Sequence, residues 1–219
     1  MSNQTKPTNL KIHDFPIESF IGGCYIPNKV CDDLIDFFES NPDRQYAGKV
    51  NKNPNEEKDE GVRVSQSENE VKKSIDIGLL PMEDGHDMLL LQDYFYYLNQ
   101  CILEYEFKYP QVKELAHYGT VEGLNIQKYE PGEGFYEWHQ ERNGKSTMTR
   151  CFVHMTYLND VKDGGTDFWF QKLTSPAKKG LTLIWPADWT HLHKGQISQT
   201  DTKYILTGWY HIAIDPDNY

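Results

Sequence analysis

The latter part of the chain constrains the fold most strongly, because from Gly123 onward it consists of short runs rich in β-branched and aromatic residues. Runs of this length and composition are typical of β-strands. They read GLNIQKY, RCFVHMTYL, GTDFWF, GLTLIWPA and KYILTGWYHIAI. Sequences that favour turns separate them, namely EPGEG, DGG and the stretches that contain AKKG and PADW. This part of the chain is therefore expected to form many short strands.

Two segments before Pro110 carry apolar residues at helical spacing. The first begins after Pro27, stops at Asn41–Pro42, and has its apolar face formed by Cys31, Leu34, Ile35 and Phe38. The second ends before Pro110, and its face is formed by Leu91, Tyr94, Phe95, Leu98, Ile102 and Tyr105. Two helices followed by many strands predict an α+β fold. The expected core is a β-sandwich of the jelly-roll type, a double-stranded β-helix, covered on one side by the N-terminal helices.

The length of 219 residues suits one domain with a sizeable core. We expect the helical support and a mobile loop within residues 1–120, and the jelly-roll core within residues 121–214. The loop is predicted from the polar stretch between Tyr46 and Asp84, whose apolar patches at Val62–Val64 and Ile75–Leu80 are brief enough for one or two short strands.

The formal net charge of -11 argues against general binding to nucleic acid or to anionic membranes, because both require clusters of Lys and Arg. The chain has no apolar run of roughly 18 residues, and its first residues lack the apolar core of a signal peptide. We therefore expect a cytoplasmic protein with neither a nucleic acid nor a membrane as its partner.

The four cysteines are widely scattered and form no CxxC pair that would suggest a zinc site or a redox dithiol. They are Cys24, Cys31, Cys101 and Cys151. We expect four reduced thiols that pack as small apolar side chains.

Two histidines and a carboxylate form the most informative candidate site. His139 and Glu141 lie two residues apart after a predicted strand and a glycine-containing turn. In an extended segment such residues project to the same side, so both could bind one ion. His193 lies beside a later predicted strand. Two imidazoles and one carboxylate with the remaining positions open form the facial triad of non-haem iron(II) oxygenases.

The distal part of this pattern is more specific than the HxE pair alone. Lys203 follows His193 by ten residues and Trp209 follows it by sixteen. His191, two residues before His193, is the alternative to it. Only when counted from His193 do the two spacings match those of the family described next. Lys203 lies in an otherwise apolar predicted strand, on the side that Trp209 shares at a period of two. A cation that faces inward needs an anionic partner to offset its desolvation.

These spacings resemble the prolyl 4-hydroxylase-like branch of the iron(II)- and 2-oxoglutarate-dependent dioxygenases. The resemblance also includes a YxxG string that begins at Tyr129 and a central block from RCFVHMTYL to the DGG sequence, and it covers Leu124 to His211. It implies that His139, Glu141 and His193 bind Fe(II) and that Lys203 grips the far carboxylate of 2-oxoglutarate. The hydroxyls of Tyr129 and Tyr157 are expected to assist Lys203.

One ligand position departs from the family pattern, which is HxD, because this chain has Glu141. The longer side chain still supplies a carboxylate, so iron binding is expected to survive with an altered affinity or geometry. A halogenase is disfavoured, since that carboxylate is typically missing in halogenases.

The resemblance implies an enzyme that uses Fe(II), 2-oxoglutarate and O2, with ascorbate as a candidate reductant, and that releases succinate and CO2. The first expectation for its substrate is a prolyl residue in a peptide or protein. The alternatives are another protein residue, a small molecule, or a jelly-roll module that binds a metal or ligand without catalysis. A nucleobase demethylase fits less well, because such enzymes carry a second Arg in the distal strand where this chain has Trp209.

Overall fold

The computed structural model describes residues 7–48, 71–80 and 85–213. Within these residues the α-helices are α1 (Asn28–Ser40) and α3 (Gly85–Lys108). Both helices were predicted from their apolar spacing, and both end where Asn41–Pro42 and Pro110 require it. The strands are β1 (Lys11–Ile12), β2 (Gly22–Tyr25), β3 (Tyr46–Ala47), β4 (Ile75–Leu79), β5 (Tyr118–Gly119), β6 (Leu124–Tyr129), β7 (Arg150–Tyr157), β8 (Val161–Phe168), β9 (Leu173–Ala177), β10 (Leu181–Pro186), β11 (His193–Gly195) and β12 (Lys203–Ile212).

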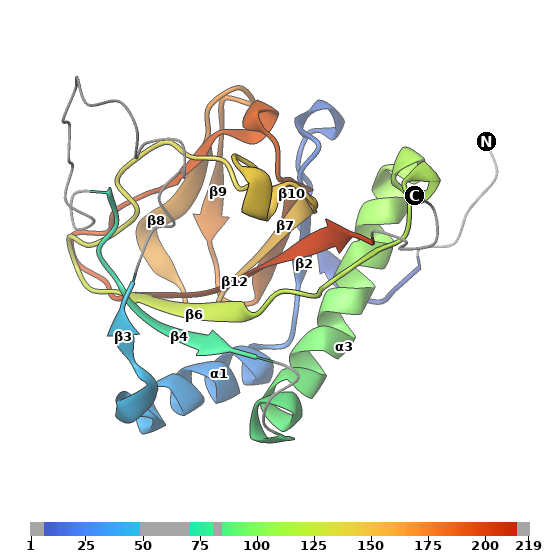
Figure 1. Cartoon of the computed structure of the whole chain (residues 1–219). Coiled ribbons are helices and arrows are strands. Elements are labelled where there is room, and N and C mark those ends of the chain that lie inside the picture. The colour runs from blue at the N-terminus through green and yellow to red at the C-terminus, as the bar shows by residue number, and fades with distance from the viewer. Residues whose placement is uncertain (1–6, 49–70, 81–84, 214–219) are drawn as a thin grey trace.

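The strands form two antiparallel sheets (Figure 1). The larger sheet runs β1-β2-β10-β7-β12-β6-β4-β3, with β5 paired to β12 beside this path, and the smaller runs β11-β8-β9. Sequence neighbours are often not sheet neighbours, so β12 lies between β6 and β7. This is the expected α+β arrangement with a jelly-roll core, and the prediction of the fold class is confirmed.

The central strand β7 separates two apolar cores, and it is buried along its whole length. On one face, Val153 and Met155 join a cluster with residues of β8, β10 and β12, between the two sheets. On the other face, Phe152 joins a cluster with the helices. The alternation of strand side chains thus lets one strand serve both layers.

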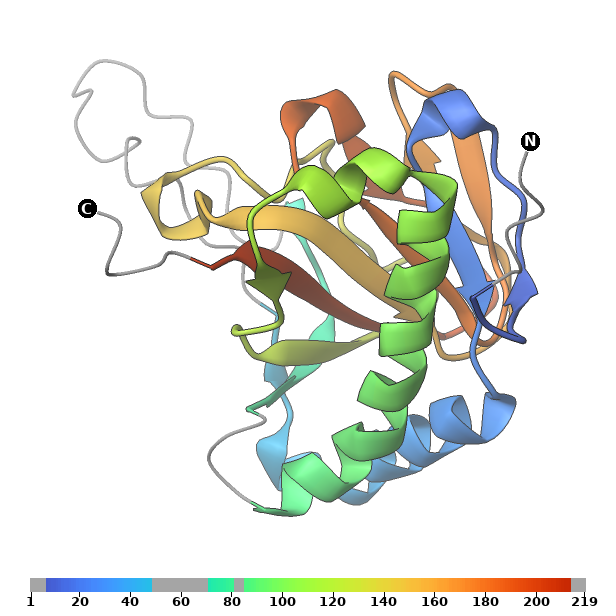
Figure 2. The same cartoon turned by 90° about the vertical axis from the view of Figure 1, so that its right-hand side faces the viewer.

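The long helix α3 crosses the outer face of the larger sheet (Figure 2), where it contacts β2 and β10. The fully buried Tyr94 on α3 places its hydroxyl 3.1 Å from His154 Nδ1 and 3.2 Å from Thr156 Oγ1 on β7. The helix α1 packs against α3 through its apolar face. The helices therefore cover one face of the larger sheet, and the space between the two sheets is lined mainly by strand residues.

The DGG sequence does not form the expected turn, because it lies inside β8 as a bulge. Asp163 has a φ of 55°, and the register with β9 shifts between Val161 and Thr166. A Cβ atom on Gly165 would lie 1.9 Å from the carbonyl oxygen of Ser175. The glycine is needed here for close backbone approach and not for chain reversal.

The strand β9 was not expected, because Pro176 interrupts the stretch between the β8 region and the AKKG turn. Pro is tolerated here since β9 is the edge strand of the smaller sheet, where a missing N–H breaks no essential ladder. The strand predicted from the run GTDFWF was too long at its end. The strand β8 ends at Phe168, and Trp169 and Phe170 beyond it are exposed.

The predicted mobile loop between Tyr46 and Asp84 falls largely outside the described residues, including the patch at Val62–Val64. The described part of that stretch contains β3 and β4, and β4 accounts for the apolar patch at Ile75–Leu80. All four cysteines are free and buried, as expected. In the described parts of the chain, no helix has the length and apolarity required to cross a membrane.

Candidate active site

A short β-bridge brings His139 and His193 together. The two residues exchange backbone hydrogen bonds of 3.0 Å in both directions. His193 begins β11, which pairs with β8, so the bridge attaches the His139 segment to the edge of the smaller sheet. The ring centroids of the two imidazoles lie 4.2 Å apart.

Backbone carbonyls orient both imidazoles. His139 Nδ1 lies 3.1 Å from the carbonyl of Glu137, and His193 Nδ1 lies 2.9 Å from the carbonyl of His191. A carbonyl can only accept, so each Nδ1 carries a proton, and Nε2 is the nitrogen that offers a lone pair in the neutral ring. Both Nε2 atoms face Glu141 Oε1 at 3.5 Å.

Glu141 is tied at its backbone and at its second carboxylate oxygen. Its N–H donates to the carbonyl of Ala187 at 3.2 Å. Oε2 accepts a hydrogen bond of 3.1 Å from Nε1 of Trp209 and lies 3.5 Å from Nη1 of Arg150. Oε1 is therefore the oxygen presented to the two imidazoles.

The ionisation states suit a cation. Burial alone would raise the pKa of the Glu141 carboxyl, but hydrogen bonds and charge from His139 and His193 hold this pKa well below its ordinary value. Burial lowers the pKa of His193, which favours its neutral imidazole. One ligand atom from each of His139, Glu141 and His193 lies within 4.8 Å of the others. Two imidazoles and one carboxylate are the donor set that a divalent first-row ion takes.

His191, the alternative to His193, points elsewhere. It ends the short 3-10 helix η6 (Trp189–His191), where its Nε2 lies 3.0 Å from the carbonyl of Ser19 and its Nδ1 lies 3.0 Å from Thr190 Oγ1. His191 thus ties η6 to the N-terminal segment, and it does not join the group of potential metal ligands.

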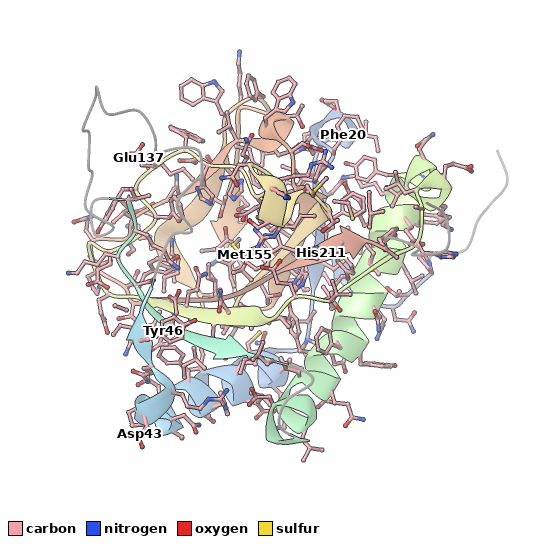
Figure 3. All side chains as sticks on the ribbon, in the orientation of Figure 1. Phe20, Asp43, Tyr46, Glu137, Met155 and His211 are labelled. Atoms are coloured by element: carbon pink, nitrogen blue, oxygen red, sulfur yellow. The ribbon has the colours of Figure 1, made fainter. Side chains whose placement is uncertain are left out.

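A cavity of about 640 Å³ opens beside the three residues. One wall is apolar and comes from the strands that face the smaller sheet, through Val153, Met155, Trp185 and Ile205. Met155 lies near the middle of the molecule (Figure 3). Polar residues also line the cavity, namely Lys72 and, on the paired strands β4 and β6, Asp76, Asn125 and Gln127.

Lys203 projects into this cavity and is 5% exposed. Its Nζ donates to the carbonyl of Gln196 at 2.7 Å and to that of Gly164, in the β8 bulge, at 3.2 Å. Within the described residues Lys203 has no ion pair with a carboxylate, and burial lowers its pKa to about 8. Trp209 lines the cavity with it, as expected from the shared side of the strand, and so do Ile205 and Thr207.

The two tyrosines also line the cavity, but each hydroxyl has a protein partner. The ring centroid of Tyr129 lies 5.3 Å from Lys203 Nζ, so the two side chains form a cation–π pair. The Tyr129 hydroxyl donates to Gln127 Oε1 at 2.6 Å. The hydroxyl of Tyr157 lies 2.6 Å from Thr166 Oγ1 and 2.8 Å from Ser175 Oγ. The structure thus brings Lys203, Tyr129 and Tyr157 to one cavity with His139, Glu141 and His193.

Sequence analysis missed Arg150 and Glu122. Arg150 is 6% exposed and forms a two-point ion pair with Glu122 beside the Glu141 carboxylate. A signal was present, because Arg150 opens an otherwise apolar predicted strand just as Lys203 does. Its partner could not be found, since Glu122 lies in a loop far away in the sequence.

Residues 124–211 match the model of the 2OG-Fe(II) oxygenase superfamily. This match gives that part of the chain the sequence pattern of a 2OG-Fe(II) oxygenase domain. The matched residues are the same as those on which the resemblance rested. The expected enzyme class, a 2-oxoglutarate-dependent dioxygenase with Fe(II), 2-oxoglutarate and O2, is confirmed. No curated protein shows significant sequence similarity to the oxygenase.

Several prolyl hydroxylases share the fold of this oxygenase at low sequence identity. A viral collagen prolyl hydroxylase from Paramecium bursaria Chlorella virus-1, in a 2-oxoglutarate complex, has a TM-score of 0.60 and 16% identity over 89% of this chain and 97% of its own. A Pseudomonas putida prolyl-4-hydroxylase has a TM-score of 0.61 and 11% identity over 90% and 97%. A Trichoplax adhaerens prolyl hydroxylase, complexed with a peptide fragment of hypoxia inducible factor, has a TM-score of 0.62 and 14% identity over 87% and 83%.

Proposed function

We propose that the oxygenase hydroxylates a prolyl residue of a peptide or protein, with His139, Glu141 and His193 as the ligands of its Fe(II). The observation that carries this proposal is the convergence of two Nε2 atoms and one carboxylate oxygen within 4.8 Å at the wall of a cavity. Carbonyls orient both imidazoles through Nδ1, as is usual for histidine ligands of metals, and the Glu141 carboxyl has a lowered pKa.

The 2-oxoglutarate is proposed to lie with its far carboxylate at Lys203. This ammonium is buried with two carbonyl oxygens as its hydrogen-bond acceptors, which do not neutralise its charge. A carboxylate would supply that neutralisation through a charge-assisted hydrogen bond. The hydroxyls of Tyr129 and Tyr157 line the same cavity and are proposed to assist.

Bound Fe(II) with 2-oxoglutarate and O2 supplies the oxidising power, which couples release of succinate and CO2 to hydroxylation of a C–H bond. The side chains of the protein bind, orient and exclude water. Val153, Met155 and Ile205 make the wall near the ligands apolar, and Lys203 fixes one end of the cosubstrate. The substrate would then occupy the rest of this cavity.

The prolyl assignment is supported by the shared fold of three prolyl hydroxylases, one of them in complex with a peptide. The test is a panel of proline-containing peptides incubated with Fe(II), 2-oxoglutarate and ascorbate, with mass detection of one added oxygen atom. Matched peptides with Ala in place of Pro, and the Glu141→Ala enzyme, are the controls. Oxygen gain on the Ala peptides would contradict a prolyl target.

A second candidate is hydroxylation of a free small molecule. The cavity volume of about 640 Å³ lies inside the range of roughly 300–1,000 Å³ that is usual for small-molecule sites. The same assay with free proline and other amino acids separates the two candidates. Turnover of a free amino acid without turnover of any peptide would favour the second candidate.

A further inference from the structure

The carboxylate of Glu141 is held from the side opposite the imidazoles. Trp209 donates its indole N–H to Oε2 at 3.1 Å. Arg150 places Nη1 3.5 Å from the same oxygen and 3.2 Å from the backbone carbonyl of Glu141. Both contacts go to Oε2 or to the backbone, so Oε1 is left facing His139 and His193.

Arg150 and Trp209 are themselves fixed. The guanidinium of Arg150 stacks over the Trp209 ring at 3.7 Å from its centroid. Its Nε and Nη2 donate to the two carboxylate oxygens of Glu122 at 2.9 and 2.5 Å. His211 Nε2 lies 2.9 Å from Glu122 Oε2. A planar guanidinium bound at two points and stacked on a ring has little freedom to rotate.

The contacts of Arg150 and Trp209 with Glu141, called the clamp below, meet a need that the longer side chain of Glu141 creates. Glu has one more rotatable bond than Asp, so an unrestrained Glu141 could turn its carboxylate away or present both oxygens to one ion. The contacts to Oε2 oppose both options, because either movement would give up the hydrogen bond from Trp209 and the contact with Arg150. An Asp at the same backbone position would fall short by about 1.5 Å, the length of one C–C bond, and could not keep both contacts.

We propose that Arg150 and Trp209 are positioning residues that hold Glu141 Oε2, so that Oε1 alone is offered to the metal, and that this clamp is why the chain carries Glu at this position. The inference rests on the ligand set of the proposed function. Neither residue touches the ion or the substrate in this role, because each acts through the Glu141 carboxylate.

The test measures Co(II) binding to the metal-free protein, with dissociation constants from calorimetry and the d–d absorption spectrum at saturating Co(II). The variants are Trp209→Phe, which removes one N–H and keeps an aromatic ring, and Arg150→Lys, which keeps the charge and loses the planar fork. Trp189→Phe is the matched control, since Trp189 is 63% exposed and does not line the cavity. Thermal unfolding of each metal-free variant monitors the fold.

We expect both variants to bind Co(II) about 10- to 100-fold more weakly, the usual effect of losing a residue that orients a ligand. Their spectra should change, whereas Trp189→Phe should match the native protein. A lower stability alone cannot change the spectrum of the saturated site. Native affinity and spectrum in both variants would overturn the clamp. Absence of Co(II) binding in the native protein, or binding unaffected by His139→Ala, would instead overturn the ligand set on which the clamp depends.

Discussion

His139 and His193 exchange two backbone hydrogen bonds of 3.0 Å, so a single bridge sets the distance between the two proposed imidazole ligands. Each ring is then oriented by a carbonyl at its Nδ1. Little adjustment is left to the histidines. The third residue, Glu141, reaches the site through a longer and more flexible side chain, so its length should be critical.

Glu141→Asp is expected to slow 2-oxoglutarate turnover about 10-fold or more, because the shorter arm retracts the carboxylate by about 1.5 Å from a site that tolerates about 0.5 Å. Glu141→Ala should be close to inactive. Succinate formation by the three purified proteins, with iron content checked, measures this effect. Glu114→Asp is the matched control, since Glu114 is exposed and does not line the cavity. An Asp variant faster than the native enzyme would indicate that Glu141 marks decayed catalysis.

Lys203→Ala is expected to weaken binding of 2-oxoglutarate by about 2–5 kcal/mol, the cost of removing one partner of a buried charge pair. Calorimetric titration with Mn(II) in place of Fe(II) measures this affinity without turnover. Lys178→Ala should have no effect, because the Lys178 side chain is 57% exposed. Unchanged affinity of the Lys203 variant would show that the cosubstrate is anchored elsewhere.

The same lysine predicts a pH dependence. Burial lowers the pKa of Lys203 to about 8 in the free protein, so the ammonium loses its proton as the pH rises through 8. Binding of 2-oxoglutarate should therefore weaken above pH 8, by up to about 10-fold per pH unit, and be insensitive to this group well below pH 8. Lys203→Arg should lack this decline, because guanidinium does not titrate in this range. A decline identical in both proteins would assign it to another group.

Burial of Lys203 gives the stability of the fold a pH dependence opposite to that of 2-oxoglutarate binding. The folded protein releases this proton at a lower pH than the unfolded chain, whose lysine pKa is about 10.4. The unfolded state thus binds more protons between about pH 8 and 10.4, and this group's contribution to stability rises with pH there. The cost of burying the charged ammonium destabilises the fold, and this cost is present in full below pH 8. Bound 2-oxoglutarate should offset it by supplying a counter-charge.

Asp76→Asn is expected to destabilise the fold by about 3–5 kcal/mol, because it leaves the buried Lys72 ammonium without its ionic partner. The pair is 2.7 Å long, with side chains 5% and 3% exposed. Urea unfolding measures the effect. The control Asp33→Asn breaks the exposed Lys29–Asp33 pair, which has the same sequence spacing, and should cost under about 1 kcal/mol. Equal losses in the two variants would show that burial of the Lys72 pair is unimportant.

Much of the fold could be predicted from local patterns. The helix α1 and the inward side of β12 follow from spacing alone, because an apolar period reports burial wherever an element has one buried face. Lys203 could also be identified from the sequence, since a cation in an apolar strand needs an anionic partner. These features depend on residues close together in the chain.

The features that were missed depend on contacts between distant segments. Arg150 was passed over because its partners, Glu122 and Trp209, lie in other parts of the chain. The DGG sequence was read as a turn because glycine favours turns, whereas the structure uses it to bring β8 close to Ser175 and to aim the Gly164 carbonyl at Lys203. No local pattern distinguishes these two uses.

The most direct test of the account is a crystal structure of the oxygenase with Mn(II) and 2-oxoglutarate. We predict one ion with His139 Nε2, Glu141 Oε1 and His193 Nε2 at about 2.0–2.3 Å, the range usual for N and O ligands. The far carboxylate of 2-oxoglutarate should contact Lys203 Nζ. An ion bound through His191, or a cosubstrate carboxylate placed away from Lys203, would contradict the account.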